Sequence, residues 1–389
     1  MAGVCGSNYR MFGAYRFGLA ITVVVGHSWT LTFGDRTVFV AEIGMGNVAV
    51  MGFFVLSGFI ISEAVDIFYV NRPGAFLLNR ALRLLPPYWL AVVVSIVIHV
   101  TLSSMGILKL QDYVIPPPDM FSAQNLLIQV TNIIPILNFN KIFASGQEWY
   151  PFVRFAWAVL VEFIFYFAFF LAMVAWPAAR RFCSLRTYLI LCAVGALGIH
   201  IVHGYLQPLH SSLSFTPYFV LGCSMYVAMT RRDRVAVLIA AASYAFVLLH
   251  FSRYTQGNVP ISREYWSGLS RPAVLTPLVS MAAVPMLLFG LAEWQAALRT
   301  VRVDKFLGDL TYPIYLNQYS IIIIALSVTH TPSWIIQTAT VMAVLAVGWI
   351  MKAVVEAPVA SLRTAIRGAP LLTMPAIASP GLPRTRSAG

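Results

Sequence analysis

Long apolar stretches recur along the whole chain, separated by shorter polar segments. Ten of them approach or exceed the roughly 20 residues that a helix needs to cross the hydrocarbon of a bilayer. Because a segment in lipid must satisfy its own backbone hydrogen bonds, each is predicted to be a helix. They cover residues 11–33, 43–66, 85–105, 150–176, 187–204, 213–229, 234–251, 272–291, 309–329 and 333–352. The pattern predicts an all-α, polytopic membrane bundle of about ten transmembrane helices.

The composition supports a membrane protein over a soluble one. Of the 389 residues, 59% are hydrophobic and 10% are charged, whereas soluble domains carry about a quarter charged residues. The net charge of +12 would suit a nucleic-acid-binding protein, but no basic–aromatic strip, zinc-finger spacing or RNA-binding motif accompanies it. No nucleic-acid partner is therefore expected. The four cysteines form no CxxC pair, so neither a disulfide framework nor a metal site is expected.

The distribution of basic residues predicts the orientation of the bundle. If the N-terminus lies in the cytoplasm and each segment reverses direction, only seven of the 26 Lys and Arg residues fall on the outer side. These seven are Arg36, Lys109, Lys141, Arg154, Arg253, Arg263 and Arg271. The remaining basic residues lie on the inner side, which is the positive-inside pattern of multispan proteins. An even number of spans and cytoplasmic N- and C-termini are therefore predicted.

Two regions depart from the pattern of spans joined by short loops. Within the loop 106–149, the apolar stretch 121–139 is interrupted by several amide side chains. We predict an interfacial or re-entrant element there rather than a further span, since long loops often act as lids or binding elements. Residues 366–389 are rich in Pro, Ala and Ser and are predicted to form a disordered cytoplasmic tail. The membrane domain is accordingly assigned to residues 1–365.

Titratable groups inside apolar segments are costly and are therefore candidates for function. Arg16 lies at the inner end of the first segment, and His27 follows eleven residues later. Eleven steps of about 100° return to nearly the same helical face and rise about 16 Å. Histidine acts as a base near neutral pH; the alternative is a buried histidine bonded to a backbone carbonyl. Glu162, at mid-depth in the fourth segment, is a further candidate.

A pair of arginines precedes the third apolar segment. Arg80 and Arg83 are three residues apart and therefore lie on nearly the same side of a helix. They are predicted to face the cytoplasm, where arginine binds phosphate through two parallel hydrogen bonds. The alternatives are that they set the topology or contact lipid headgroups. The glycines of segment 44–60 are followed by no phosphate-loop lysine, so they indicate close helix packing.

Six short motifs occur in an order that is specific as a set, although each motif alone is weak. Arg16 and His27 form the first, with Arg-x10-His spacing. The others are Gly52 to Ile60 (GFFVLSGFI), Phe76 to Trp89 (FLLNRALRLLPPYW), Trp157 to Tyr166 (WAVLVEFIFY), Leu307 to Leu316 (LGDLTYPIYL) and Val355 to Pro358 (VEAP). Through these motifs the chain resembles the acyltransferase-3 family of multispan membrane proteins, from about Tyr9 to Arg363.

Three positions differ from the pattern of the family that the chain resembles. Ala158 stands where the family has a serine, and Asn79 stands where it often has a further arginine. Gln318 stands where the ninth-segment motif commonly ends in histidine. The predicted site thus lacks a second histidine, and its phosphate clamp is lighter by one arginine. No esterase-like domain follows the tenth segment, so the chain resembles the stand-alone form.

The resemblance implies a membrane O-acyltransferase that moves an acyl group from cytosolic acyl-CoA to a hydroxyl of an exported or lipid-linked glycan. Acetyl-CoA is the expected donor substrate, with succinyl as the alternative group; no bound cofactor or metal is implied. Arg16, Arg80 and Arg83 would hold the anionic donor. His27 would act as the base or carry the acyl group, and Glu162 would orient its imidazole. The expected location is the bacterial inner membrane, as a multi-pass protein.

Two other function classes remain open on the sequence. A secondary transporter or glycolipid flippase also uses intramembrane Arg, His and Glu, although we find no paired repeats of the kind such folds often carry. Uptake of substrate without acyl-CoA would favour that class. A sensor or scaffold without chemistry would tolerate replacement of Arg16, His27 and Glu162.

Overall fold

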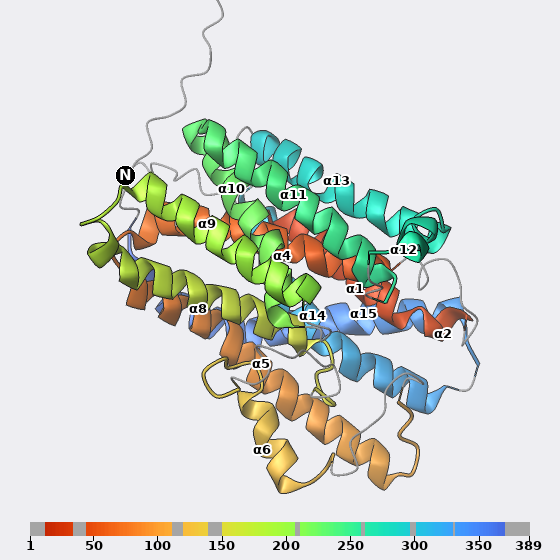
Figure 1. Cartoon of the computed structure of the whole chain (residues 1–389). Helices are drawn as coiled ribbons and strands as arrows, with labels where there is room; N and C mark the ends of the chain where they lie inside the picture. The colour runs from red at the N-terminus through yellow and green to blue at the C-terminus, as the bar shows by residue number, and fades with distance from the viewer. Residues whose placement is uncertain are drawn as a thin grey trace, which may run out of the picture.

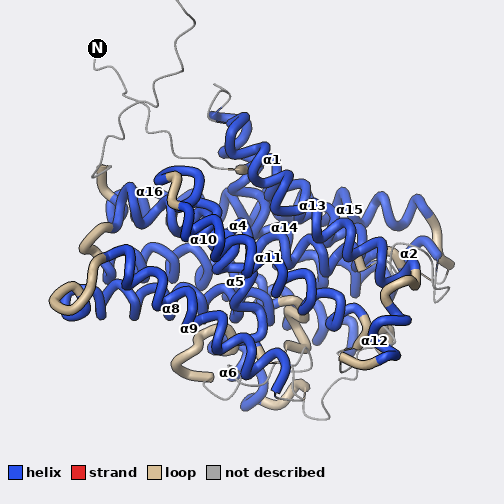
Figure 2. The backbone as a smooth tube through the Cα atoms, turned by 45° about the horizontal axis from the view of Figure 1, so that its top comes forward, coloured by secondary structure: helices blue, strands red, loops and turns tan. Residues whose placement is uncertain are grey.

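The computed structural model describes residues 12–33, 44–110, 120–138, 150–206, 211–257, 261–295, 301–329 and 331–369. Throughout these ranges the chain forms helices joined by turns and loops, without a β-strand (Figures 1 and 2). The predicted all-α bundle is therefore confirmed.

Each of the ten predicted segments corresponds to a helix in the described part of the chain. The long helices are α1 (Gly13–Ser28), α4 (Met45–Ala64), α5 (Pro73–Ser104), α8 (Ala156–Ala179), α9 (Leu185–Ile201), α10 (Thr216–Arg231), α11 (Arg234–Thr255), α13 (Pro272–Gln295), α14 (Val301–Val328) and α15 (Trp334–Met351). The shorter α-helices are α2 (Thr30–Phe33), α6 (Ala123–Thr131), α12 (Arg263–Gly268) and α16 (Ala357–Arg367). Three π-helical turns, η1 (Val65–Tyr69), η3 (Val202–Leu206) and η5 (Lys352–Glu356), and the 3₁₀ turn η4 (Ser212–Phe215) complete the chain.

Seven helical stretches of the described residues are long and apolar enough to cross a membrane. α1 is outside this set because it has only 16 residues. α14 carries the polar side chains Asn317 and Gln318 near its centre, where a lipid-facing helix would be apolar. Both polar side chains are buried, so the bundle and not the lipid surrounds them. The structure thus supports a polytopic bundle, while ten as the number of spans and the cytoplasmic termini remain predictions.

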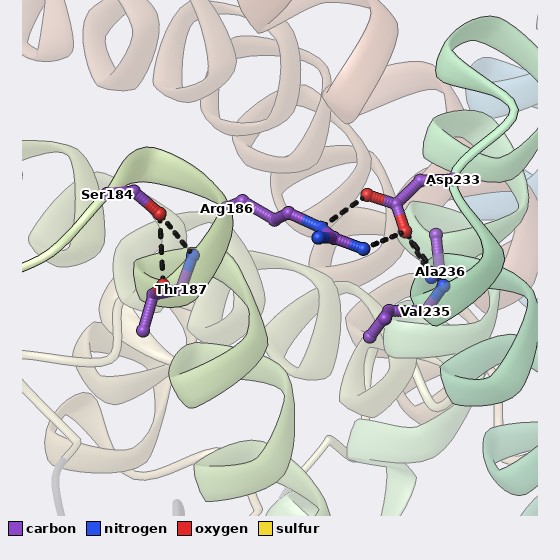
Figure 3. A network of polar contacts seen from close by, with 6 residues as sticks. All are labelled: Ser184, Arg186, Thr187, Asp233, Val235 and Ala236. Carbon is purple, nitrogen blue, oxygen red and sulfur yellow. Dashed lines mark hydrogen bonds and ion pairs between the residues drawn. The ribbon is translucent and has the colours of Figure 1, made fainter.

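The long axes of the helices run roughly alongside one another, and the turns collect at two ends. The turns between α8 and α9 and between α10 and α11 lie at the same end as α16, and α2 and α12 lie at the other (Figures 1 and 2). At the first end, Arg186 on α9 binds both carboxylate oxygens of Asp233, at 2.8 and 3.1 Å (Figure 3). This end carries the loops predicted to be cytoplasmic.

α4 is the central helix and is buried along most of its length. It packs closely on α10, because a Cβ on Gly58 would lie 2.2 Å from the carbonyl oxygen of Phe219. A Cβ on Gly222 of α10 would lie 1.9 Å from the carbonyl oxygen of Val55. Small residues let the backbones of membrane helices approach in this way. The close packing predicted for segment 44–60 is therefore confirmed at Gly58.

α5 begins at Pro73, well before the predicted segment 85–105. Proline suits the first turn of a helix, where its missing N–H removes no intrahelical bond. The arginines that follow it interrupt the apolar run, which is why the sequence placed the start of the span later. As a consequence, Arg80 and Arg83 belong to α5 itself and not to a loop before it.

The loop between α5 and α8 holds α6, whose nine residues are too few to cross a bilayer. α6 is held on α5, since the Tyr88 hydroxyl donates to the Gln129 carbonyl (2.6 Å) and the Trp89 indole donates to the Val130 carbonyl (2.9 Å). Leu127 of α6 is 70% exposed. The prediction that this stretch is not a further span is confirmed; its interfacial placement remains a prediction.

The predicted end of the membrane domain at residue 365 falls within α16. Ile366 and Arg367 form the last turn of this helix, and the disordered tail remains a prediction. Residues 370–389 lie outside the described residues.

Candidate functional site

A cavity between α1, α4, α5, α8 and α14 brings together four of the five predicted site residues. Arg16, Arg80, Arg83 and Glu162 all line it. Its volume is about 730 Å³ including the open part, and most of its other walls are apolar or aromatic side chains. The five helices meet in the middle of the bundle in Figure 1. The sequence therefore found the charged residues of a single site, although they lie on three different helices.

α5 presents its two arginines to the cavity from the same side, as their spacing predicts. Arg80 is only 4% exposed, and its guanidinium lies 5.7 Å from the ring centroids of both Phe76 and Tyr166. A cation over an aromatic face is attracted by the negative face of the ring. Two rings therefore help to hold a guanidinium that burial would otherwise disfavour.

Arg16 reaches the cavity from the first turn of α1, and α14 fixes that turn. The carboxylate of Asp304 accepts from the backbone N–H groups of Gly13 (2.9 Å) and Ala14 (2.8 Å). A carboxylate stabilises these otherwise unpaired N–H groups at a helix start. A Cβ on Gly308 would lie 3.1 Å from Cα of Gly13, so glycine lets α14 approach α1 there. The start of α1 is thereby positioned with Arg16.

The charges that line the cavity favour an anion. Three arginines, Arg16, Arg80 and Arg83, face a single carboxylate, Glu162. Charges in a partly buried site are screened less than charges on the surface. Guanidinium groups also present paired donors that match phosphate and carboxylate oxygens. The cavity is therefore suited to a ligand with phosphate groups.

Glu162 is held inside the cavity by two hydroxyl groups. The hydroxyl of Ser57 on α4 donates to Oε1 of Glu162 (2.7 Å), and the hydroxyl of Tyr166, one turn further along α8, donates to the same oxygen. These bonds tie Glu162 to the arginine end of the cavity and not to the imidazole of His27. The geometry thus gives no support for an orienting role of Glu162 towards His27. Arg16 and Glu162 line the same cavity, and His27 lies about 16 Å further along α1 than Arg16. The imidazole therefore lies at a different depth in the bundle from the carboxylate.

His27 lies beyond the cavity and belongs to a second polar group. Its Nδ1 is 3.2 Å from Oε1 of Gln318, and its ring stacks on Phe155 with centroids 3.6 Å apart and planes 6° apart. A Cβ on Gly46 would lie 3.6 Å from His27 Nε2, so a glycine faces that side of the ring. The buried guanidinium of Arg154 is close enough to interact with the imidazole electrostatically.

Gln318 sets the tautomer of His27. The side-chain amide nitrogen of Gln318 donates to the carbonyl oxygen of Tyr315 (3.0 Å), which leaves Oε1 facing the imidazole as an acceptor. A neutral imidazole carries its proton on one nitrogen and a lone pair on the other. The proton therefore sits on Nδ1 of His27, where it is donated to Gln318, and the lone pair sits on Nε2. That is the form in which histidine accepts a proton or attacks a carbonyl.

One face of α14 joins the cavity to the His27 group. Thr311 and Tyr315 line the cavity, and Gln318 follows at the next turn, since positions i, i+4 and i+7 share a helical face. The hydroxyl of Tyr315 donates to the carbonyl of Phe155 (2.8 Å), the residue whose ring stacks on His27. Tyr315 thus forms the boundary between the two groups.

The sequence missed several members of both groups. Arg154 counts in the sequence only towards the topology, because it lies at the outer end of the fourth segment, and Ser57 lies in the segment 44–60 that indicates helix packing. Gln318 stands out only as a departure from the family pattern. The only feature of the sequence that could have identified these three residues is their position within or beside the motifs. In the described part of the chain, no group of three or more His, Cys, Asp or Glu side chains is arranged to hold a metal ion.

Comparison with known proteins assigns the chain to a family. Residues 14–353, most of the chain, match the acyltransferase domain of the acyltransferase-3 family. No curated protein and no solved structure gave a match. The matched range begins next to the α1 start that Asp304 holds, and it includes Arg16, His27, Arg80, Arg83 and Glu162. The chain therefore belongs to the acyltransferase-3 family and is a membrane acyltransferase that acts on groups other than aminoacyl groups.

Proposed function

We propose that this protein transfers an acyl group, acetyl in the first instance, from cytosolic acyl-CoA to a hydroxyl of an exported or lipid-linked glycan. The proposed location is the bacterial plasma membrane. One observation carries the proposal: Arg16, Arg80 and Arg83 line one cavity, with one face of α14 leading from it to His27. The family supplies the reaction class, and the residues of the cavity supply the argument for the donor.

The donor is recognised by its charge. Acyl-CoA carries phosphate groups at one end and the reactive thioester at the other. Phosphate oxygens match the paired donors of a guanidinium, and Arg80 and Arg83 stand on the part of α5 predicted to face the cytoplasm. Aromatic and apolar walls beyond the arginines suit the uncharged arm of the molecule. The arm then extends along α14, past Tyr315, towards His27.

His27 acts as the general base in this proposal. Its Nε2 takes the proton of the acceptor hydroxyl while the hydroxyl oxygen attacks the thioester carbonyl carbon. The carbon–sulfur bond then breaks, and the imidazolium returns the proton to the leaving thiolate. The products are an acyl ester and free CoA, and His27 ends in its starting form. A positioned base of this kind contributes about 10² to 10⁴ in rate.

Arg154 and Glu162 take supporting roles that follow from their positions. Arg154 is buried and interacts with the imidazole, so we assign it to the negative charge that develops on the carbonyl oxygen. A fixed cation there stabilises the transition state. Glu162, held by Ser57 and Tyr166, lines the path of the donor arm and offers its carboxylate to amide N–H groups of that arm.

Mass spectrometry of cell-envelope glycans tests the proposal in four strains: gene deleted, complemented, complemented with His27→Ala, and complemented with His203→Ala as a matched control. We expect an acyl mass increment only with the intact gene and the control, at equal protein abundance. The mass increment identifies the acyl group, and the fragment that carries it identifies the acceptor. An increment that persists with His27→Ala would rule out the base assignment.

The same strains separate acyl transfer from transport. Identical glycans in deleted and complemented cells would contradict the proposed acceptor class. Uptake of a labelled glycan or glycolipid by proteoliposomes that contain no acyl-CoA would then identify a transporter. Release of free thiol from acetyl-CoA by the purified protein, dependent on His27, would instead keep the reaction and change only the acceptor.

A further inference from the structure

The last helix, α16, carries a further arginine beside the cavity. We propose that Arg363 is an additional phosphate-binding residue of the donor site and that α16 forms the cytoplasmic wall of that site. The ligand chemistry is a phosphate group, either of acyl-CoA or of an anionic lipid headgroup, and we assign it to acyl-CoA. The inference rests on the proposed function, because acyl-CoA is the donor there.

α16 is fastened to α5 through its own C-terminal carbonyl groups. Arg72 donates to the carbonyls of Ile366 (2.8 Å) and Arg367 (3.0 Å), and Asn79 donates to the carbonyl of Arg363 (2.7 Å). The carbonyls of Ile366 and Arg367, at the end of α16, lack intrahelical partners and need such donors. Higher residue numbers on α5 meet lower ones on α16, so the two helices run antiparallel. Two anchor points fix α16 in position and in rotation.

This fastening brings Arg363 close to the cavity arginines. Arg363 interacts electrostatically with Arg83 and Arg80, which line the cavity, and with the carboxylates of Glu356 and Asp309. Glu356 also interacts with Arg83. Like charges held together repel, and these two carboxylates offset only part of the charge of the three guanidinium groups. A polyanionic ligand would relieve the remaining repulsion.

Arg363 also has donor capacity that the protein does not use. Its Nε–H is buried and has no hydrogen-bond partner within the described residues. A buried donor without a partner is costly. A phosphate oxygen at this position would satisfy it and would add the attraction of opposite charges.

Asn79 of α5 is an amide directly before the cavity arginine Arg80. That amide binds the backbone of Arg363, so it positions a guanidinium rather than supplying one. Asn79 is a positioning residue, and Arg363 is the residue that contacts the ligand.

Calorimetric titration of CoA into the purified full-length protein in neutral detergent tests the proposal. Arg363→Gln should weaken CoA binding about tenfold or more, the value expected for loss of a hydrogen bond to a charged group. The KM for acyl-CoA should rise equally, with kcat kept within about twofold. Arg363→Lys should restore part of the affinity, and Arg180→Gln, which removes the same charge from the exposed C-cap of α8, should leave it unchanged.

Asn79→Ala gives an independent readout of positioning. It should weaken CoA binding less than Arg363→Gln does, and the double variant should bind no more weakly than Arg363→Gln alone, because residues of one unit are non-additive. Wild-type CoA affinity in Arg363→Gln with an unchanged melting temperature would overturn the inference. Full additivity of the two changes would overturn the positioning role of Asn79.

Further measurements separate failure of this inference from failure of the proposed function. Wild-type protein that binds no CoA and releases no thiol from acetyl-CoA would defeat the proposed function. Wild-type protein that binds CoA equally well with and without Arg363 would defeat only the inference. In nanodiscs with and without phosphatidylglycerol, loss of a lipid-dependent rise in melting temperature in Arg363→Gln, with CoA affinity intact, would assign Arg363 to a lipid headgroup and contradict the proposal.

Discussion

The amide oxygen of Gln318 lies 3.2 Å from Nδ1 of His27, and the amide nitrogen of Gln318 is bound to the carbonyl of Tyr315. The second bond fixes which end of the amide meets the imidazole. Gln318 is fully buried, so water does not compete for either bond. The proposed base is therefore oriented by α14, whose preceding turn lines the donor cavity.

Gln318→Leu should lower kcat at least about tenfold and leave the KM for acyl-CoA nearly unchanged. Leucine removes the acceptor that keeps the proton on Nδ1 of His27. In molecules whose proton moves to Nε2, that nitrogen has no lone pair and cannot act as the base. Gln318→Glu keeps an acceptor at the same place and should retain more activity than the leucine variant. Steady-state kinetics on purified protein measure both; equal losses in the two variants would indicate a packing role only.

His27→Ala should reduce turnover by about 10² to 10⁴, the contribution of a general base. The bundle should still fold, because the His27 side chain is only partly buried and one side of its ring faces Gly46, which has no side chain to lose contact with it. Thiol release from acetyl-CoA in the presence of acceptor measures the first effect, and the elution profile of the detergent-solubilised protein measures the second. Full turnover in a properly folded variant would remove His27 from the mechanism.

Much of this arrangement was predictable from the chain itself. The apolar runs predicted the helices, the cost of charge in lipid identified Arg16 and Glu162, and a spacing of three residues identified Arg80 and Arg83; one cavity unites all four. Arg16 and Glu162 stand out because each is a charged residue within an apolar run.

The partners of those residues were not predictable in the same way. Gln318 and Ser57 are ordinary polar residues within helices, and their roles follow from which helix lies opposite. The link from Asn79 to Arg363 joins positions 284 residues apart. The hydrogen bonds of Glu162 to Ser57 and Tyr166 were not predictable either, because sequence gives the depth of a residue along its own helix but not which side chains of other helices lie opposite.

Glu162→Gln and Gln318→Leu should have independent effects. Glu162 belongs to the arginine end of the site and Gln318 to the His27 end. Their hydrogen-bond partners are different residues, Ser57 and Tyr166 for Glu162 and His27 and Tyr315 for Gln318. Changes at separate groups usually add on a free-energy scale within about 0.5 kcal/mol. We expect the first change to act mainly on the KM for acyl-CoA and the second on kcat. Strong coupling in the double variant, measured as kcat/KM, would place both residues in one group.

Gly58→Ala should destabilise the bundle by about 1–3 kcal/mol, the usual cost of overpacking. Its new methyl group would meet the Phe219 carbonyl at 2.2 Å, and neither backbone moves easily where α4 and α10 pack so closely. Gly195→Ala on α9 is the matched control, because a Cβ there meets no atom within 4 Å. Melting temperatures in detergent compare the two. An equal or smaller loss for Gly58→Ala would show that α4 and α10 separate without cost.

The ion pair between Arg186 and Asp233 gives a prediction for pH. Asp233 also accepts from the backbone N–H groups of Val235 (2.7 Å) and Ala236 (3.3 Å) and so caps α11 (Figure 3). The hydrogen bond from Arg186 holds the pKa of the Asp233 carboxyl below its usual value. A carboxyl with a lowered pKa in the folded state stabilises the protein above the unfolded pKa, about 4, and loses that contribution as the pH falls through the folded value.

Asp233→Asn separates the two roles of this residue. Asparagine caps a helix nearly as well as aspartate but forms no ion pair, so the variant should melt slightly below the wild type, and Asp233→Ala, which loses both, should melt lower still. Between pH 5 and 8 the gap between wild type and Asp233→Asn should stay constant, because the carboxyl is ionised throughout. Below about pH 4 the gap should shrink as the wild-type carboxyl takes up its proton. A gap that widens on acidification would mean that the pKa of Asp233 is raised in the folded protein, and Arg186 would then have no stabilising role at this end of the bundle.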